Sequence, residues 1–405
     1  MKNFKIVLLI ITTIMLFNSC KDFVSNTDSL IDRIEDSKLN DPAQIPFLIS
    51  GLKTKFSTAA SYTIVLSDVL SDLLNKNPYS YFENSYSYDE IVLGTISLNN
   101  GFITKAYRYL GEARFYADNL VERVLKEKIA DQELKRKALF TGKFYGGYTR
   151  FLYATYFGLS ETNGGSPVNG SKFISSDKLY TQAINLFKEA LESTNDPWQK
   201  RLTNSMIAKS YLLQGNYVNA VAFALKGLSI GDPSFSIKFS SQFGYNNRYY
   251  LFASDVLLLF IIDKRFPKYI EAEPNEANRI KIDSVNSYFN KNVFLFYQTK
   301  YNNLDSPEDL ISWQENSLML AELALRNQAS AGNALTLVNE VRSSHNIPPL
   351  NNVDLGTIYI ERDKELFCTG NRLPDERRFN KFHLPAGRWQ YLPVPAEERD
   401  RNNNL

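Results

Sequence analysis

The sequence predicts an all-α fold in which helix pairs stack into an α-α superhelix and long irregular loops connect them. Three observations support this prediction. Apolar residues recur at spacings of three and four through most of the chain after residue 45. Residues 201–233 have the residue order of a tight helical hairpin. The hydrophobic content of 44% is ample for a large core.

The helical pattern begins near Ile45 and continues until Asn75-Lys76-Asn77-Pro78 stops it. Between Tyr79 and Asn100 the periodicity fails, and the composition indicates a loop rich in Tyr, Asn and Ser. Helical spacing returns from Ala106 to Val124 and again from Leu134 to Phe157.

The strongest internal signal is a tetratricopeptide-like order of small and aromatic residues, with Gly227 where alanine is usual: Ala208, Tyr211, Gly215, Tyr217, Ala220, Leu228 and Pro233. Small residues let two helices approach, and Gly215 with Asn216 turns the corner. We expect Tyr211 to fill the seam. Further helix pairs are expected from a hairpin near residues 136–157, from Ala183–Leu191 and from Ala321–Val341, so that the pairs lie within about 136–233 and 312–345.

The amino terminus has the layout of a bacterial export signal. Lys2 and Lys5 precede an apolar run of twelve residues, Ile6–Phe17, whereas a transmembrane helix needs roughly twenty. Ser19-Cys20 then resembles the end of a lipobox; an ordinary signal with an incidental cysteine is the alternative. We expect residues 1–19 to be removed and Cys20, acylated with palmitate or a similar chain, to hold a tether at residues 20–44 on a membrane.

Cysteine and charge content narrow the class of protein. Once Cys20 is acylated, Cys368 has no intrachain partner, so stability must come from the core. Of the 46 basic residues two lie in the signal, which leaves 44 basic and 44 acidic residues and no run rich in Lys or Arg. Nucleic acid is therefore not expected as a partner, because its recognition requires a basic patch or excess.

Motifs for catalysis and cofactor binding are absent from the sequence. The two histidines, His345 and His383, exclude a multi-histidine metal site, and both are expected to be surface or packing residues. No HExxH, CxxC, GxSxG, P-loop or GxGxxG motif is present. Acidic residues that are adjacent in the sequence, such as Glu397-Glu398, do not establish the distance between two catalytic carboxyl groups that glycoside hydrolysis requires. The sequence predicts no enzyme, cofactor or metal-ligand set; a hydrolase is unsupported.

Four separated segments resemble, in order, parts of the SusD/RagB outer-membrane lipoproteins of Bacteroidetes. They are Ser19–Phe23; Trp313–Glu322 with Ala334-Leu335 and Val338–Arg342; Glu361–Leu366 with Gly370–Arg372 and Asp375–Arg378; and Leu392–Pro395 with Glu398 and Asn402–Leu405. Thr369, Pro374 and Asn403 depart from the family's pattern, and about residues 234–310 align with nothing in it.

The resemblance implies a single SusD-like domain at 45–405 that ends in a signature segment at 358–405. It further implies a lipid-anchored protein of the outer membrane, facing the exterior, that captures glycan or other nutrient polymer fragments. These would pass to a TonB-dependent, SusC-like transporter. The alternative is a tetratricopeptide scaffold lipoprotein that assembles envelope proteins and binds no small ligand.

Residues of the signature are expected to be structural. We expect an ion-pair network that locks the carboxyl-terminal segment onto the helix pairs, made by Glu361, Arg362, Glu365, Arg372, Asp375 and Arg377. Trp313 opens an apolar helix and is expected in the core.

Two segments rich in aromatic and amide residues, 79–88 and 243–250, are the predicted binding loops. Aromatic faces stack against sugar rings, while amides and an arginine bond to hydroxyls. The candidates are Tyr79, Tyr81, Asn84, Tyr86, Tyr88, Tyr245, Asn247 and Arg248. The alternative is that half of the aromatic residues lie in the core and the rest cover helix ends.

Overall fold

The computed structural model describes residues 36–80, 85–242, 244–288 and 290–405. The predicted signal, Cys20, most of the tether, Tyr81 and Asn84 lie outside the described residues. The chain divides into two compact units, residues 1–45 and 46–405. The described part of the first unit holds two short 3-10 helices, Asp36–Asn40 and Pro42–Gln44, and Asp41 caps the second by accepting a hydrogen bond from the backbone N–H of Ala43.

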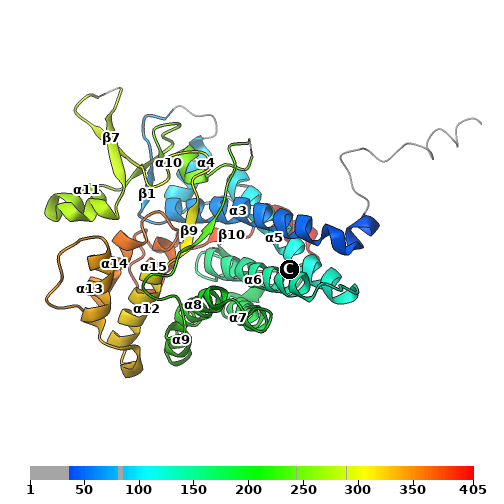
Figure 1. Ribbon diagram of the computed structural model, residues 1–405. Coiled ribbons are helices and arrows are strands. Elements are labelled where there is room, and N and C mark those ends of the chain that lie inside the picture. Colours follow the sequence, from blue (N-terminus) through cyan, green and yellow to red (C-terminus); the bar gives the residue numbers. More distant parts are fainter. Residues whose placement is uncertain (1–35, 81–84, 243, 289) are drawn as a thin grey trace, which may run out of the picture. The chain divides into compact units, whose positions relative to one another are not determined.

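Helices dominate the second unit, which confirms the all-α prediction (Figure 1). They are α3 (Ile45–Leu70), α4 (Ser85–Val92), α5 (Gly101–Lys126), α6 (Gln132–Tyr156), α7 (Ser176–Glu192), α8 (Pro197–Leu213), α9 (Tyr217–Ala224), α10 (Arg248–Ala253), α11 (Arg265–Ala272), α12 (Trp313–Leu325), α13 (Ala334–Ser344), α14 (Leu355–Glu365), α15 (Arg372–Arg378) and α16 (Ala396–Arg401).

Short strand pairs join segments that are distant in the sequence. They are β1 (Leu74–Lys76) with β6 (Phe260–Ile262), β2 (Phe157–Gly158) with β10 (Leu392–Pro393), β3 (Gly165–Ser166) with β4 (Ile174–Ser175), β5 (Phe235–Ile237) with β9 (Glu308–Ile311), and β7 (Ile282–Asn286) with β8 (Phe294–Gln298). The β2–β10 pair is parallel, with Leu392 opposite Phe157, and the other pairs are antiparallel. The closing segment is thereby held at the end of α6.

Two of the helix pairs predicted from residue spacing are confirmed, α8 with α9 and α12 with α13, and the core of the first follows from its small residues. Ala208 on α8 and Ala220 on α9 are fully buried against Met319 and Leu323 on α12. Tyr211 packs against the same cluster, as expected for the residue that fills the seam. Gly215 has φ +74°, the left-handed conformation that a helix-to-helix turn requires and that glycine adopts without strain.

The glycine at position 227 has a packing reason. A Cβ placed there would lie 2.4 Å from Ser205 Oγ and 2.6 Å from Asn316 Oδ1. These two side chains are hydrogen-bonded to each other, and Asn316 also bonds to the carbonyl oxygens of Ala224 and Leu228. Even the alanine usual at this position would therefore disturb the contact between α9 and α12.

The hairpin expected near residues 136–157 is wrong. One continuous helix, α6, covers this stretch, and it packs against both α5 and α7. The paired glycines Gly146-Gly147 lie within this helix and do not break it. Gly147 allows close approach of Phe187 on α7, since a Cβ there would lie 2.9 Å from that ring. The helix pair is therefore α6 with α7.

Helix α3 supplies the centre of the second unit. Every residue from Phe56 to Leu70 is buried, whereas residues before Phe56 alternate between buried and exposed positions. Trp313 is 8% exposed, which confirms its predicted place in the core. No helix within the described ranges is long and apolar enough to cross a membrane.

Candidate functional site

The two predicted binding segments lie next to each other. β1 precedes the first segment and β6 follows the second, and these strands pair from Leu74↔Ile262 to Lys76↔Phe260. Behind them the ring of Tyr88 lies 4.9 Å from that of Phe260 and 6.4 Å from that of Phe252. The strand pair and the aromatic core beneath it thus bring together segments more than 150 residues apart.

The first segment is less open than its composition indicates. Ser85–Val92 forms α4, which places Tyr86 at 74% exposure and Tyr88 at 4%. Tyr88 stacks on Phe102 of α5 with ring centroids 4.1 Å apart. Its assignment as a binding residue is corrected: Tyr88 is a core residue, and Tyr86 is the exposed one. Tyr79 is half-buried in the turn before the helix.

Asn247 also has a structural role, which corrects its assignment to ligand binding. It is fully buried and is the N-cap of α10, where its Oδ1 accepts a hydrogen bond from the backbone N–H of Tyr250 at 2.8 Å. Its Nδ2 donates to the carbonyl oxygen of Ser306. All of its hydrogen-bonding groups in the side chain are thus engaged within the fold.

Of the remaining candidates in this segment, Arg248 is buried at 8% exposure. The Arg248 guanidinium lies 4.4 Å from the ring centre of Tyr62 on α3 and donates one hydrogen bond to the carbonyl oxygen of Gly244. Its Nε has no partner among the described residues. Tyr245 is 40% exposed. Tyr245 thus offers an exposed ring, whereas the buried Arg248 is held in place by Tyr62 and Gly244.

Helix α5 contributes residues that were not singled out from the sequence. Its Lys105 ammonium lies 5.3 Å from the ring centre of Tyr62 and 5.8 Å from that of Tyr109. Tyr62 and Tyr109 meet edge to face at 5.4 Å. The spacing of Lys105, Tyr109, Glu112 and Tyr116 by four, three and four residues was the signal for one exposed helix face.

Lys55 on α3 extends the same surface. It forms an ion pair with Glu112 at 2.9 Å and lies 5.9 Å from the ring centre of Tyr116. The hydrogen bond to Glu112 raises the pKa of Lys55, and the nearby Tyr116 and Tyr245 raise it further. We call this group the aromatic face; its exposed or half-buried members are Tyr109, Tyr116, Tyr245, Lys55 and Lys105, and its buried members are Tyr62 and Arg248.

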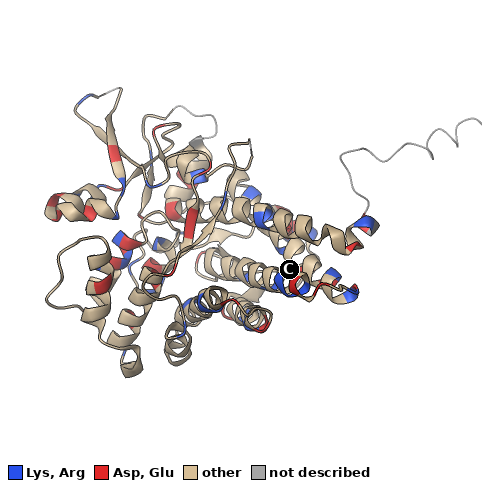
Figure 2. Ribbon diagram, viewed as in Figure 1, with Lys and Arg blue, Asp and Glu red and all other residues tan. Residues whose placement is uncertain are grey.

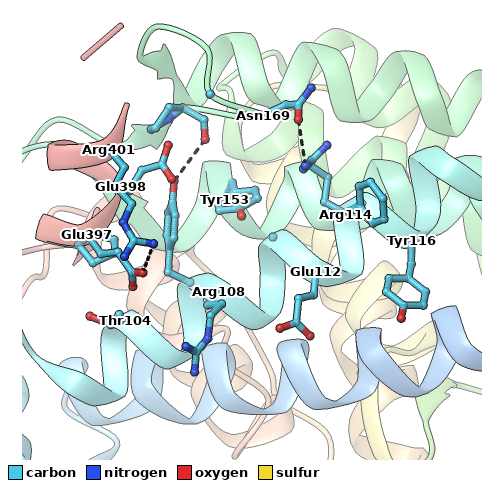
Figure 3. Close-up of a pocket in the computed structure, with 16 residues that line it drawn as sticks. Thr104, Arg108, Glu112, Arg114, Tyr116, Tyr153, Asn169, Glu397, Glu398 and Arg401 are labelled. Carbon is cyan, nitrogen blue, oxygen red and sulfur yellow. Dashed lines mark hydrogen bonds and ion pairs between the residues drawn. The ribbon is translucent and has the colours of Figure 1, made fainter. Parts of the chain in front are cut away.

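A cavity of about 510 Å³ adjoins the aromatic face and shares Tyr116 with it (Figure 3). Helix α5, residues 167–170 and α16 form its walls. Gly111 opens its floor, because a Cβ there would lie 3.5 Å from the hydroxyl of Tyr153. That hydroxyl has no hydrogen bond within the described part of the chain, so it can bond to a ligand in the cavity.

Two carboxyl groups lie in the core behind α10. Burial raises the pKa of Asp68 to about 7, although Tyr249 donates a hydrogen bond to it at 2.5 Å. Burial also raises the pKa of Glu308 to about 8. Glu308 accepts a hydrogen bond from Ser61 Oγ, which accepts one from the backbone N–H of Arg248. Both acids thus support the helix that begins at Arg248.

The signature residues form the predicted ion-pair network, with partners from other segments. Arg279 bonds Glu276, Glu361 and Glu365, and Arg342 also bonds Glu361 (Figure 2 shows acidic and basic residues side by side around α14).

The rest of the network fixes α15. Arg362 bonds Asp375 at 2.8 Å, and Arg372 bonds Asp72 at 2.6 Å, immediately after α3. Arg377 is the exception to the prediction: it donates to the carbonyl oxygens of Gln390 and Thr155, so it anchors the chain through backbone acceptors.

Both histidines bond to this network, His345 to Glu365 and His383 to Glu376. Among the described residues no group of three or more His, Cys, Asp or Glu side chains could hold a metal ion. The chemistry of the region is therefore that of the aromatic face and its cavity: flat rings, hydroxyls and fixed ammonium or guanidinium donors, a set that matches a polyhydroxylated ligand.

No protein-family model and no curated protein sequence matches the chain. Solved structures do match. A SusD superfamily protein from Bacteroides thetaiotaomicron is 15% identical, with 90% of this chain and 98% of that chain covered and a TM-score of 0.73. A laminarin-binding SusD-like protein is 15% identical over 89% of this chain and 98% of that chain, with a TM-score of 0.71. A surface glycan-binding protein A from Bacteroides thetaiotaomicron is 14% identical over 89% and 97%, with a TM-score of 0.67.

Proposed function

The chain has the SusD-like fold, and from this premise we propose that it captures glycan fragments on the aromatic face without cleaving them. The observation that carries the proposal is the convergence of Tyr109, Tyr245 and Arg248 from α5 and the 243–250 segment, with Lys55 and Lys105 beside them. Proteins of this fold that bind laminarin or other glycans support the ligand class.

The proposal follows from what these groups do in water. Tyrosine rings offer flat apolar area that sugar C–H faces can cover, and their hydroxyls stay available for hydrogen bonds. The ammonium groups lie at 5.3–5.9 Å from ring centres, close enough to be attracted to the rings and fixed as donors. A sugar that displaces water here replaces the hydrogen bonds that its hydroxyls made to water with hydrogen bonds to the protein. It also gains apolar contact with the tyrosine rings.

Binding by isothermal titration calorimetry tests this proposal. Laminarin-derived oligosaccharides are the first probes, followed by other neutral oligosaccharides from a glycan array. For the sugar that binds, Tyr245→Ala or Tyr109→Ala is expected to weaken affinity about tenfold each, because one ring contact of roughly 1 kcal/mol and its hydroxyl are lost.

The matched control is Phe294→Ala, which removes a 53%-exposed aromatic ring on β8, outside the aromatic face. It is expected to bind like the parent protein. Unchanged affinity in both tyrosine variants would place the ligand elsewhere, and unchanged oligosaccharide length after prolonged incubation is expected because no catalysis is proposed.

The remaining steps of uptake belong to the same proposal. Acylated Cys20 would hold the protein on the outer membrane, facing the exterior, and the captured glycan would pass to a TonB-dependent, SusC-like transporter. The lipobox-like Ser19-Cys20 after an apolar run supports the anchor. The SusD-like fold supports this place in nutrient uptake.

A further inference from the structure

A second cavity, of about 640 Å³, lies on another part of the second unit. The exposed stretch of α3, the middle of α6, the start of α8 and residues 233–238 around β5 line it. Its volume is in the range of ligand pockets, roughly 300–1,000 Å³. We call it the lysine cavity, and it shares no lining residue with the aromatic face or with the cavity of Figure 3.

The charge of this cavity is one-sided. Three lysines line it, Lys53, Lys137 and Lys238, and no Asp or Glu does. None of the three ammonium groups makes an ion pair or a side-chain hydrogen bond within the described part of the chain. Burial lowers the pKa of Lys53, and the charges of Lys137 and Lys238 lower it further. The nearest acid across β5, Asp309, bonds to Ser236 and is not a lining residue.

Three lysines share the lysine cavity, whose lining holds no acid, whereas other cations of the described residues bond to carboxylates. The Arg residues of the signature network bond to carboxylates, and Lys55, Lys76 and Lys209 do the same. Three lysines that repel one another around one cavity therefore cost free energy, which an anionic ligand would recover. The ligand that best complements the cavity carries carboxylate or sulfate groups.

The rest of the lining indicates a ligand larger than a simple inorganic anion. Tyr145 is 8% exposed, and its hydroxyl has no hydrogen-bond partner in the described residues. Trp198 lies at the cavity with its indole N–H donated to the carbonyl oxygen of Pro233, which fixes the ring. Gln199 accepts a hydrogen bond from Thr194 and keeps its Nε2 free to donate. Rings and neutral donors beside cations match an acidic sugar.

We propose that the lysine cavity is a second binding site, specific for acidic saccharides, in which Lys53, Lys137 and Lys238 neutralise the carboxylate or sulfate groups and Tyr145 and Trp198 contact the sugar rings. This inference rests on the proposed function for the class of ligand only. It adds to that function a separate site whose lining holds three lysines and no acid.

Calorimetry with α-1,4-linked trigalacturonate and its neutral counterpart galactotriose tests the inference on the full chain. Trigalacturonate is expected to bind at least tenfold more tightly than galactotriose, and raising the salt from 50 to 200 mM should weaken only the acidic ligand. The double variant Lys53→Gln/Lys238→Gln is expected to lose about tenfold in affinity for trigalacturonate.

The matched control is Lys264→Gln/Lys291→Gln, which removes the same charge from exposed lysines outside the cavity and should bind within twofold of the parent. Equal affinity for the two trisaccharides would overturn the inference, as would equal losses in the two double variants. Competition by inorganic phosphate at the same concentration as trigalacturonate would also overturn it, because the sugar would then contribute nothing.

The failure of this inference is distinguishable from that of the proposed function. If trigalacturonate binding is lost in Tyr245→Ala and kept in Lys53→Gln/Lys238→Gln, the acidic sugar occupies the aromatic face; the lysine cavity is then refuted and the proposed function stands. If neutral sugars bind unchanged to Tyr245→Ala while the lysine variants lose trigalacturonate, the lysine cavity stands and the aromatic face is refuted.

Discussion

At the scale of single residues, burial decides which side chains can bind and which hold the fold. Tyr86 and Tyr88 are two positions apart, yet one is 74% exposed and the other 4%. Asn247 and Arg248 are adjacent in the sequence, yet the side chain of Asn247 caps the amino terminus of α10 and that of Arg248 lies over the ring of Tyr62. The proposed ligand recognition therefore depends on the few aromatic residues that remain exposed or half-buried, such as Tyr109, Tyr116 and Tyr245.

Asp68 gives a prediction on pH. Its pKa in the folded protein, about 7, lies above the ordinary value of 3.8, so the folded chain keeps a proton that the unfolded chain has released between about pH 4 and pH 7. The stability that Asp68 contributes therefore falls as pH rises through this range. Asp68→Asn removes this titration. The free energy of unfolding of the variant should therefore rise relative to that of the parent by about 1.4 kcal/mol per pH unit between pH 5 and pH 7.

Urea unfolding at pH 5, 6, 7 and 8 measures this difference. The gain should level off above pH 7, and the exposed-site variant Asp305→Asn should follow the parent at every pH. A constant difference between Asp68→Asn and the parent would contradict the assignment of Asp68 as a buried, largely protonated acid. The other groups that face Asp68, namely Tyr249, Lys300, Asp363 and Cys368, are unchanged in both variants.

At the scale of elements, the sequence predicted what local spacing encodes. The α8–α9 pair is specified by small residues and a turn glycine within 30 residues, so periodicity alone revealed it. The segment near 136–157 was predicted as a hairpin, whereas Gly146-Gly147 lies inside one continuous helix. Its actual role, close contact with Phe187 on α7, depends on a helix that the local sequence does not contain.

Gly227 gives a prediction at this scale. Gly227→Ala would put a methyl group within 3 Å of Ser205 Oγ and Asn316 Oδ1, so α9 and α12 must separate or lose the hydrogen bonds of Asn316. We expect a loss of about 1–3 kcal/mol in unfolding free energy, measured by urea denaturation. Gly101→Ala, at a helical position with nothing within 4 Å, is the control and should be neutral or slightly stabilising. Equal stability of the two variants would refute the packing account.

At the scale of the whole molecule, the sequence could predict fold and class but not the partners of distant side chains. It identified Glu361, Arg362 and Arg372 as network members, because charged residues gather in one segment. It could not reveal Asp72 or Arg279, which are 300 and 82 residues away from the partners they bond. For the same reason the sequence predicted only part of the aromatic face. Tyr245 and Arg248 lie in a segment whose composition indicated a binding loop, whereas Tyr109 and Lys105 lie in a helix with an ordinary amphipathic pattern.

In its native membrane, we propose, the protein works as the glycan-capturing partner of a TonB-dependent transporter. Affinity purification of the lipidated protein from its own envelope in mild detergent, with partners identified by mass spectrometry, tests this claim most directly. The account predicts a TonB-dependent barrel in near-equal amount, absent when Cys20→Ala is purified in the same way. Recovery of other envelope proteins without such a barrel would contradict it and would favour an assembly scaffold instead.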